Sequence, residues 1–352
     1  MLAVGTKEGR VQLVNPETGE TRFNLGAHTD VTTCVALSSD GSILASASRD
    51  GTLKVWDASN GVQLLGVKGT CFLTLDFSPC GKRLAAAGTG GDICEWDSQT
   101  GEEQKQLRGH ARWVNAVSYL PDGMQLMSGG WDESVRIWDL KSGLCSWESE
   151  GAHVGGVLSV SCSRRGDHVA SGGADGTAKV WKAQGTNSAL LHTLLLHGSV
   201  VHSVAFSPSG ETLASGGGDK TIRLWQVDSG LQTICNRGHD GTHGCLCRRV
   251  DAGQRCSVLG HRGSVRSVAF SIDGRRIASS SGGGGCKVWL AKSGAHVRNL
   301  RTGPIIALAF GQDLSRNQKC EAFAMGQLQR LSAKSRVYDL EPGLVRLIIL
   351  AV

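Results

Sequence analysis

The sequence predicts an all-β protein built from repeated antiparallel units. The clearest unit spans Gly109–Asp139. Its three apolar runs cover 114–119, 125–128 and 135–138, and two turn-forming triplets, Pro121-Asp122-Gly123 and Trp131-Asp132-Glu133, divide them. Short apolar runs separated by such turns indicate an antiparallel meander of strands and not a helix.

The same unit recurs along the chain at a fixed internal spacing. A histidine stands 28 residues before a tryptophan in five places, namely His28/Trp56, His110/Trp138, His153/Trp181, His197/Trp225 and His261/Trp289. A serine lies ten residues before each tryptophan (Ser46, Ser128, Ser171, Ser215 and Ser279), and an aspartate lies six before the first four (Asp50, Asp132, Asp175 and Asp219). Agreement at several positions in every copy indicates a repeat architecture.

The Gly109–Asp139 unit opens with Gly109-His110 and closes with Trp138-Asp139, and with these signatures it resembles the WD40 repeat. The resemblance covers about residues 2–310. In the WD40 family a repeat of about 40–45 residues forms one four-stranded blade of a β-propeller. The expected fold is therefore an all-β WD40 β-propeller.

The blades can be assigned in chain order. Leu2–Thr6 and Arg10–Asn15 match the second and third strands of a repeat that lacks its first strand. A full repeat, 28–57, follows. The next one, 66–97, is degenerate, because no Gly-His precedes it and Gly90 replaces the turn aspartate. Regular repeats then end at Trp138, Trp181, Trp225 and Trp289.

The interval from Trp225 to Trp289 is 64 residues, about 22 more than the other intervals. Two Gly-His pairs, Gly238-His239 and Gly260-His261, bracket the excess. Residues 239–260 are therefore interpreted as an insert in one loop between blades, because surface loops tolerate insertion.

Pro304–Phe310 matches a seventh first strand. If it pairs with Leu2–Thr6, the N- and C-terminal parts share the closing blade of a seven-bladed ring, and the exposed strand edges disappear. Glu321–Met325 and Arg336–Leu340 resemble weak further strands, so eight blades or a fragment of a longer array stay open. The expected domains are a propeller over 1–310 with the insert 239–260, and a degenerate repeat or tail over 311–352.

The His110, Ser128 and Asp132 set has the composition of a hydrolase triad. The WD40 resemblance implies instead that His, Ser, Asp and Trp form a buried hydrogen-bonded set that holds each blade together. Repetition of the set in four blades argues against catalysis, since an enzyme needs one site. We therefore expect no catalytic residue and no enzyme activity.

No cofactor or metal is expected. The insert does carry ligand types, with histidines at 239 and 243 and cysteines at 245, 247 and 256, but the Cys-x-Cys spacing departs from that of common zinc sites. The net charge of +6 comes from interspersed residues, so a nucleic acid is not expected as a direct ligand. The longest apolar run, 347–352, is too short for a membrane span. Without a secretory leader or a disulfide framework, the expected location is intracellular, cytoplasmic or nuclear.

Partner contacts in this family come from the face that carries the loops before each first strand and between the second and third strands. The resemblance places six residues there as candidates: Arg49, Trp113, Asn115, Trp131, His202 and Arg266. Trp113 and Trp131 are the largest. The predicted function is a non-catalytic scaffold that binds a protein or peptide partner on this face and supports a multiprotein complex. An RNA- or ribosome-associated propeller is the alternative, and a propeller enzyme is the least favoured.

Overall fold

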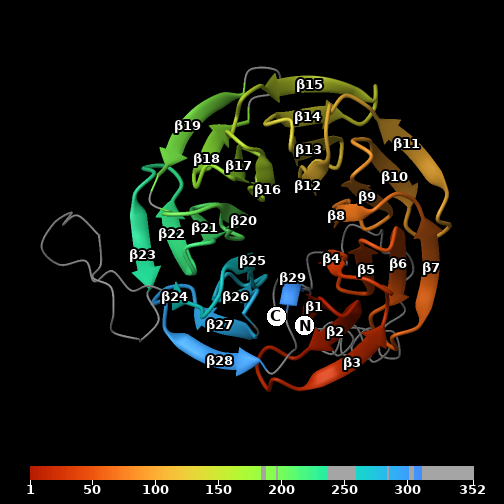
Figure 1. The fold of residues 1–352 in the computed structure, drawn as a ribbon, viewed down its shortest axis with the longest axis horizontal. Helices are drawn as coiled ribbons and strands as arrows, with labels where there is room; N and C mark the ends of the chain where they lie inside the picture. The colour runs from red at the N-terminus through yellow and green to blue at the C-terminus, as the bar shows by residue number, and fades with distance from the viewer. Residues whose placement is uncertain (184–187, 196, 237–258, 284, 301–304, 311–352) are drawn as a thin grey trace, which may run out of the picture. The chain divides into compact units, whose positions relative to one another are not determined.

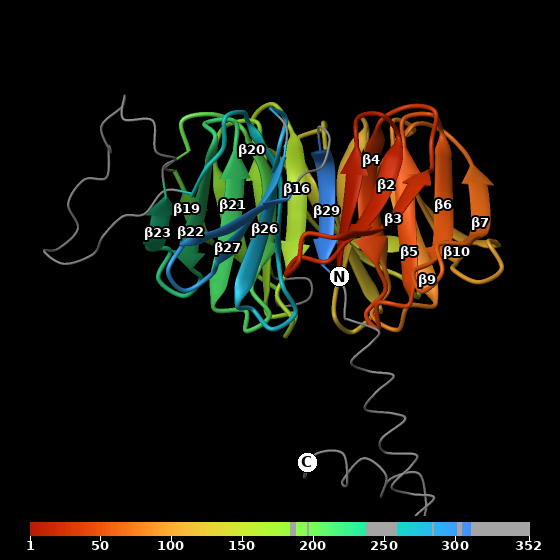
Figure 2. The same cartoon turned by 90° about the horizontal axis from the view of Figure 1, so that it is seen from below.

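The computed structural model describes residues 1–183, 188–195, 197–236, 259–283, 285–300 and 305–310. All regular elements in these ranges are β-strands, arranged as seven antiparallel sheets around a common axis (Figure 1). We call the region that the seven inner strands surround the central channel. Each sheet is one blade. The strands run between the two faces of the ring (Figure 2). The sequence prediction of an all-β, seven-bladed propeller is confirmed.

Six blades follow one another along the chain, and their first-named strand is the innermost. Blade 1 is β4 (Thr32–Leu37), β5 (Ile43–Ser48), β6 (Thr52–Asp57) and β7 (Gln63–Lys68). Blade 2 is β8 (Phe72–Phe77), β9 (Arg83–Gly88), β10 (Ile93–Asp97) and β11 (Glu103–Leu107). Blade 3 is β12 (Val114–Tyr119), β13 (Gln125–Gly130), β14 (Val135–Asp139) and β15 (Leu144–Ser149).

Blade 4 is β16 (Val157–Cys162), β17 (His168–Gly173), β18 (Ala178–Lys182) and β19 (Ala189–Leu194). Blade 5 is β20 (Val201–Phe206), β21 (Thr212–Gly217), β22 (Thr221–Gln226) and β23 (Gln232–Asn236), and the short β24 (Leu259–Gly260) also pairs with β22. Blade 6 is β25 (Val265–Phe270), β26 (Arg276–Ser281), β27 (Cys286–Leu290) and β28 (His296–Leu300).

Blade 7 combines one strand from the C-terminal part of the propeller with three strands from its N-terminal part. Its strand order is β29 (Ile305–Phe310), β1 (Leu2–Thr6), β2 (Arg10–Val14) and β3 (Thr21–Gly26). β29 pairs antiparallel with β1, and Leu2 lies opposite Phe310. The predicted shared closing blade is therefore confirmed, and the pairing with β29 covers the inner edge of β1.

The hydrophobic core lies between neighbouring blades. One cluster, for example, packs Ala85 and Ala87 of β9 against Val117 of β12 and Trp138 of β14. Small residues on the second strands let the next blade approach closely. At Gly129 an added Cβ would lie 2.3 Å from a methyl carbon of Val157, so this position has no room for a side chain.

Hydroxyl groups also join the inner strands around the channel. The Oγ1 of Thr74 on β8 accepts the backbone N–H of Val117 on β12 at 3.1 Å. Ser203 on β20 accepts the N–H of Val268 on β25 at the same distance. Each such bond satisfies a buried donor that the sheet itself leaves unpaired, so it fixes the distance between adjacent blades.

Several expectations fall outside the described residues. The insert is described only at Leu259–Gly260, and the strands expected at Glu321–Met325 and Arg336–Leu340 are not described at all. The domain boundaries proposed from the sequence, with the insert 239–260 and a degenerate repeat or tail at 311–352, stay predictions.

Candidate functional site on the top face of the propeller

We call the top face the one formed by the loops before each inner strand and the turns between the second and third strands. In blade 3 the Nδ1 of His110 lies 2.8 Å from Asp132 Oδ2, and its Nε2 lies 2.7 Å from Ser128 Oγ. The Nε1–H of Trp138 donates to the same hydroxyl at 2.8 Å. The backbone N–H of Ala111 donates to Asp132 at 3.0 Å. These bonds link the loop before β12 to β13 and β14.

The same arrangement occurs in blades 4 and 5. The histidine Nδ1 atoms of His153 and His197 lie 3.0 Å from carboxylate oxygens of Asp175 and Asp219. Their Nε2 atoms contact Ser171 and Ser215, which also accept the Nε1–H groups of Trp181 and Trp225. In blade 6, His261, Ser279 and Trp289 are connected in the same way, although no aspartate stands six residues before that tryptophan.

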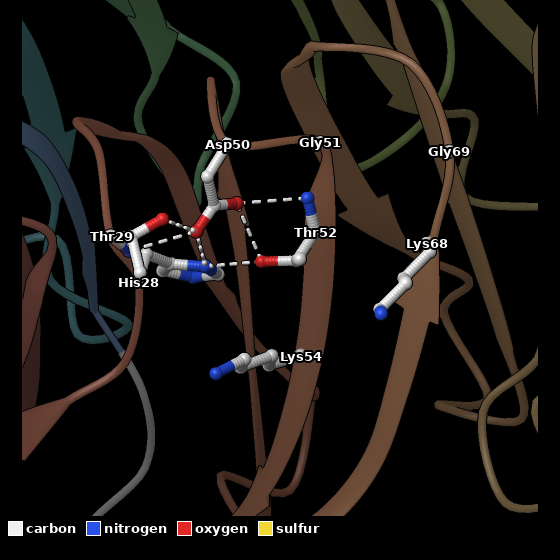
Figure 3. Close-up of a pocket in the computed structure, with 8 residues that line it drawn as sticks. All are labelled: His28, Thr29, Asp50, Gly51, Thr52, Lys54, Lys68 and Gly69. Carbon is white, nitrogen blue, oxygen red and sulfur yellow. Dashed lines mark hydrogen bonds and ion pairs between the residues drawn. The ribbon is translucent and has the colours of Figure 1, made fainter.

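Blade 1 shows a variation of this network (Figure 3). The Nδ1 of His28 lies 2.7 Å from Thr52 Oγ1 and 3.5 Å from Asp50, so the threonine hydroxyl relays the contact. His28 Nε2 contacts Ser46 Oγ at 2.8 Å, and this hydroxyl also accepts the Nε1–H of Trp56 at 3.1 Å.

His28 and Asp50 of blade 1 line a hollow of about 400 Å³ but are already engaged in hydrogen bonds. Burial lowers the pKa of His28 to about 4, so the imidazole is neutral at pH 7. Burial would raise the pKa of Asp50, but hydrogen bonds from Thr52 and Thr29 outweigh it and lower the pKa to about 2. A neutral imidazole and a fully hydrogen-bonded carboxylate offer a substrate neither a free base nor a free acid.

Trp113 and Trp131 lie at the top of blade 3 with large exposed fractions, 51% and 39%. They border a hollow of about 520 Å³ together with Arg112, Gly90 and Gly91. The two glycines form the turn between β9 and β10 of the degenerate blade 2. Because Gly90 replaces the aspartate found in blades 1, 3, 4 and 5, the hollow has backbone on the blade 2 side and indole rings on the other.

Trp131 also contacts the next blade. A Cβ added at Gly156 would lie 3.0 Å from the Cε3 atom of Trp131, so the indole packs on the backbone before β16. Its backbone N–H donates to the carbonyl of Trp113 at 2.8 Å, which fixes the two residues side by side. Val154, close to Gly156 in the same loop, is 72% exposed. The sequence offsets did not identify Val154, because it lies one residue after His153 and not at a predicted contact position.

The remaining predicted contact residues differ in how they are held. Asn115 Nδ2 donates to the carbonyl oxygen of Val157 at 2.8 Å, so its amide joins blades 3 and 4. Arg49 is exposed beside the blade 1 network. His202 and Arg266 are brought together across two blades, with Arg266 Nη1 3.3 Å from His202 Nε2.

Comparison with known proteins gives the family. The model of the family described as WD domain, G-beta repeat matches residues 19–57, 101–139, 146–182, 188–226 and 253–289, together more than half of the chain. The chain belongs to the WD40 family. The matched segments include the tryptophan of the third strand in blades 1, 3, 4, 5 and 6, and they omit β8, β9 and β10 of the degenerate blade 2.

This WD40 chain is similar to several longer WD-repeat proteins. It is 27% identical to the DENN domain and WD repeat-containing protein SCD1 of Arabidopsis thaliana, over 75% of this chain and 21% of the relative. It is 30% identical to the nuclear distribution protein PAC1-2 of Uncinocarpus reesii, over 80% of this chain and 63% of the relative. It is 28% identical to a guanine nucleotide-binding protein subunit beta of Arabidopsis thaliana, over 84% of this chain and 82% of the relative. The chain thus spans less than two thirds of the first two relatives.

One partly buried carboxylate in this WD40 ring, that of Asp76, was not among the residues that the sequence singled out. Asp76 lies on the inner strand β8, and one carboxylate oxygen accepts the backbone N–H of Tyr119 at 2.9 Å. Burial raises its pKa to about 6, and the hydrogen bonds it accepts only partly oppose that rise. Ser161 accepts the N–H of Phe206 in the same way on β16. Asp76 therefore occupies the place of a linking hydroxyl.

The described residues offer neither a cluster of metal ligands nor a membrane-spanning helix. Nowhere in them do three or more His, Cys, Asp or Glu side chains gather as a metal site would require. They also contain no helix with the length and hydropathy needed to cross a membrane. The His and Cys residues of the insert that resemble zinc ligands lie outside the described residues.

Proposed function

We propose that this protein is a non-catalytic scaffold that binds a protein or peptide partner on the top face of the propeller and supports assembly of a multiprotein complex. The observation that carries the proposal is the exposed pair Trp113 and Trp131 beside the hollow at Gly90-Gly91. Tryptophan is enriched among the residues that dominate binding energy at protein interfaces. The backbone hydrogen bond between the two residues fixes their positions relative to each other, so the pair forms a pre-organised anchor.

The repeated His, Ser and Asp residues of the blades support a scaffold function and not an enzyme activity. Each His, Ser and Asp of blades 3, 4 and 5 is engaged in bonds that join strands of its own blade. We therefore assign the sets a structural role. The name of one relative, a guanine nucleotide-binding protein subunit beta, denotes one component of a larger assembly, which supports a role in protein complexes.

We place this scaffold in the cytoplasm or nucleus. The cysteines whose side chains the structure describes are free thiols, the form that a reducing compartment maintains. The partner is then an intracellular protein.

Affinity purification with the Trp113→Ala/Trp131→Ala double variant tests the function. The double variant is expected to lose its main partner, because truncating an interface tryptophan costs about 2 kcal/mol or more of binding free energy. The recovered proteins are quantified against wild type by mass spectrometry.

The matched control is Met124→Ala/Leu144→Ala. These side chains are 62% and 69% exposed and belong to the same blade, but they lie at its opposite end, between β12 and β13 and at the start of β15. The control is expected to keep the partner. If the folded tryptophan variant retains every partner that wild type recovers, the top-face proposal is wrong. Recovery of ribosomal particles as the main partner would favour the RNA- or ribosome-associated alternative.

A further inference from the structure

Arg266 and His202 lie at the mouth of the central channel. Each is the second residue of an inner strand, Arg266 on β25 and His202 on β20. The same position carries Thr33 on β4 and Asn115 on β12. The four side chains therefore belong to one ring of residues around the mouth, on the face that also carries Trp113.

Two members of this ring, Thr33 and Asn115, form hydrogen bonds between neighbouring inner strands. Thr33 Oγ1 donates to the carbonyl oxygen of Phe72 at 2.8 Å, and Asn115 Nδ2 donates to that of Val157 at 2.8 Å. Both bonds run to the next inner strand. Such side chains position the blades and have little capacity left for a ligand.

Arg266 differs because its charge is unpaired within the described part of the chain. Its contact there is with the His202 ring, at 3.3 Å, and no described carboxylate lies within ion-pair distance. Burial and the positive charge of Arg266 lower the pKa of His202 to about 4, so the imidazole is neutral and Nε2 can accept the Arg266 N–H. The imidazole thereby orients the guanidinium without neutralising it.

The Arg266 side chain is exposed, and the neighbouring residue Gly282 has no side chain to cover it. The Nε of Arg266 lies 3.6 Å from the position that a Cβ would take at Gly282, the residue corresponding to Trp131 in blade 3. A guanidinium has five N–H donors in a planar fork, and one is directed at His202. The others match the two oxygens of a carboxylate, the group that arginine binds bidentately.

We propose that Arg266, oriented by His202, binds a carboxylate of the partner that occupies the top face. The proposal rests on the proposed function and names the chemistry of the partner. β12 and β25 lie on opposite sides of the channel (Figure 1), so a partner that crosses the mouth meets the tryptophan pair on one side and Arg266 on the other. The partner then combines an apolar residue with an acidic group across the channel.

Small probes test the carboxylate site without knowledge of the partner. The full chain with isotope-labelled histidine is titrated with N-acetylglutamate amide, N-acetylglycine and N-acetylglutamine amide, and the His202 ring signals are followed by NMR. The first probe presents a side-chain carboxylate, the second a C-terminal carboxylate, and the third is the neutral control. A signal lost in His202→Asn identifies the ring.

Saturable shifts of the His202 signals are expected with at least one carboxylate probe and not with the neutral one. Arg266→Gln is expected to lower the affinity for the carboxylate probe by about tenfold or more, because a charged hydrogen bond is lost. Arg262→Gln removes the same charge from an exposed position on the same face, and it is expected to leave the affinity within about twofold of wild type. The more effective carboxylate probe tells whether the group is a side chain or a chain end.

Equal shifts with the neutral probe, or an unchanged affinity in Arg266→Gln, would overturn the proposal. The Trp113→Ala/Trp131→Ala variant is expected to bind the carboxylate probes like wild type, since the tryptophans lie across the channel. Loss of the partner in that variant therefore reports on the proposed function alone, and loss of probe binding in Arg266→Gln reports on the carboxylate site alone.

Discussion

Asp132→Ala is expected to lower the free energy of unfolding by about 3 kcal/mol at pH 7. The carboxylate accepts bonds from His110, from the N–H of Ala111 and from the hydroxyl of Ser134, at 2.8 to 3.0 Å. Its removal leaves the buried His110 ring and a backbone donor without their acceptor, and an unsatisfied buried group costs about 1–3 kcal/mol. Urea denaturation of the variant beside wild type measures the loss.

The penalty of Asp132→Ala should depend on pH in a defined direction. Burial would raise the pKa of Asp132, but the bonds and charge of His110 and the donors of Ser134 and Ala111 lower it overall. A carboxyl whose folded pKa is lowered stabilises the protein above its unfolded pKa, about 4, and this contribution is lost as the pH falls through the folded value. The difference between variant and wild type should therefore shrink when the pH falls below about 4.

Asp122→Ala is the control for this experiment. Asp122 is exposed at the turn between β12 and β13 and accepts the N–H of Met124 at 2.9 Å. Its loss is expected to cost about 1 kcal/mol or less. Equal losses in the two variants, or an unchanged stability in Asp132→Ala, would contradict the structural role assigned to the repeated polar sets.

Asp76→Asn is expected to have the opposite effect and to raise the free energy of unfolding at pH 7.5 by about 2 kcal/mol. The pKa of Asp76 is about 6 in the folded protein, above the ordinary value of 3.8, chiefly because of burial. Each unit of such a shift corresponds to about 1.4 kcal/mol, reduced here because the side chain is only partly buried. The asparagine carbonyl can still accept the N–H of Tyr119.

The sign of the Asp76 effect follows from the raised pKa. Its contribution to stability is fully present below the unfolded pKa, about 4, and is lost as the pH rises through the folded value, about 6. The advantage of Asp76→Asn should therefore disappear near pH 4 and reach its full size above pH 6, in urea or thermal denaturation followed by circular dichroism. A variant less stable than wild type at pH 7.5 would show that the ionised carboxylate is needed.

The repeat pattern predicted the ring well because strand positions follow from local alternation and spacing. The structure places β1 at Leu2–Thr6 and β12 at Val114–Tyr119, as the sequence predicted, and it pairs β29 with β1. The closing pair was predicted because pairing the seventh first strand with the N-terminal half repeat removes the exposed edges of a seven-bladed ring, although the sequence also left eight blades open.

Contacts between blades could not be predicted in the same way. The Arg266–His202 contact joins residues 64 positions apart. Their positions in the repeat do not predict the side-chain rotamers that bring the two groups into contact. The repeat offsets placed Asn115 on the binding face but not its bond to the carbonyl of Val157. The sequence alone does not distinguish Asp76 from other strand residues, since the burial of its carboxylate depends on the ring that surrounds it.

The hollow beside the tryptophans illustrates the same limit. The sequence showed that Gly90 replaces the turn aspartate of blade 2, and it showed Trp113 and Trp131 in blade 3. Only the packing of blade 2 against blade 3 brings these features together on one face. Because the degenerate repeat of blade 2 has Gly90 in place of the turn aspartate, the hollow lies next to the exposed indole rings of Trp113 and Trp131.

Site-specific photocrosslinking tests the central claim most directly, since it reports where the partner touches the propeller. Benzoylphenylalanine is placed at position 154, which is exposed in the loop next to Trp131 on the top face, or at position 144 at the opposite end of blade 3, and the cells are irradiated. The account predicts a specific protein adduct from position 154 that position 144 does not give. An adduct with the same partner from position 144, and none from position 154, would contradict it.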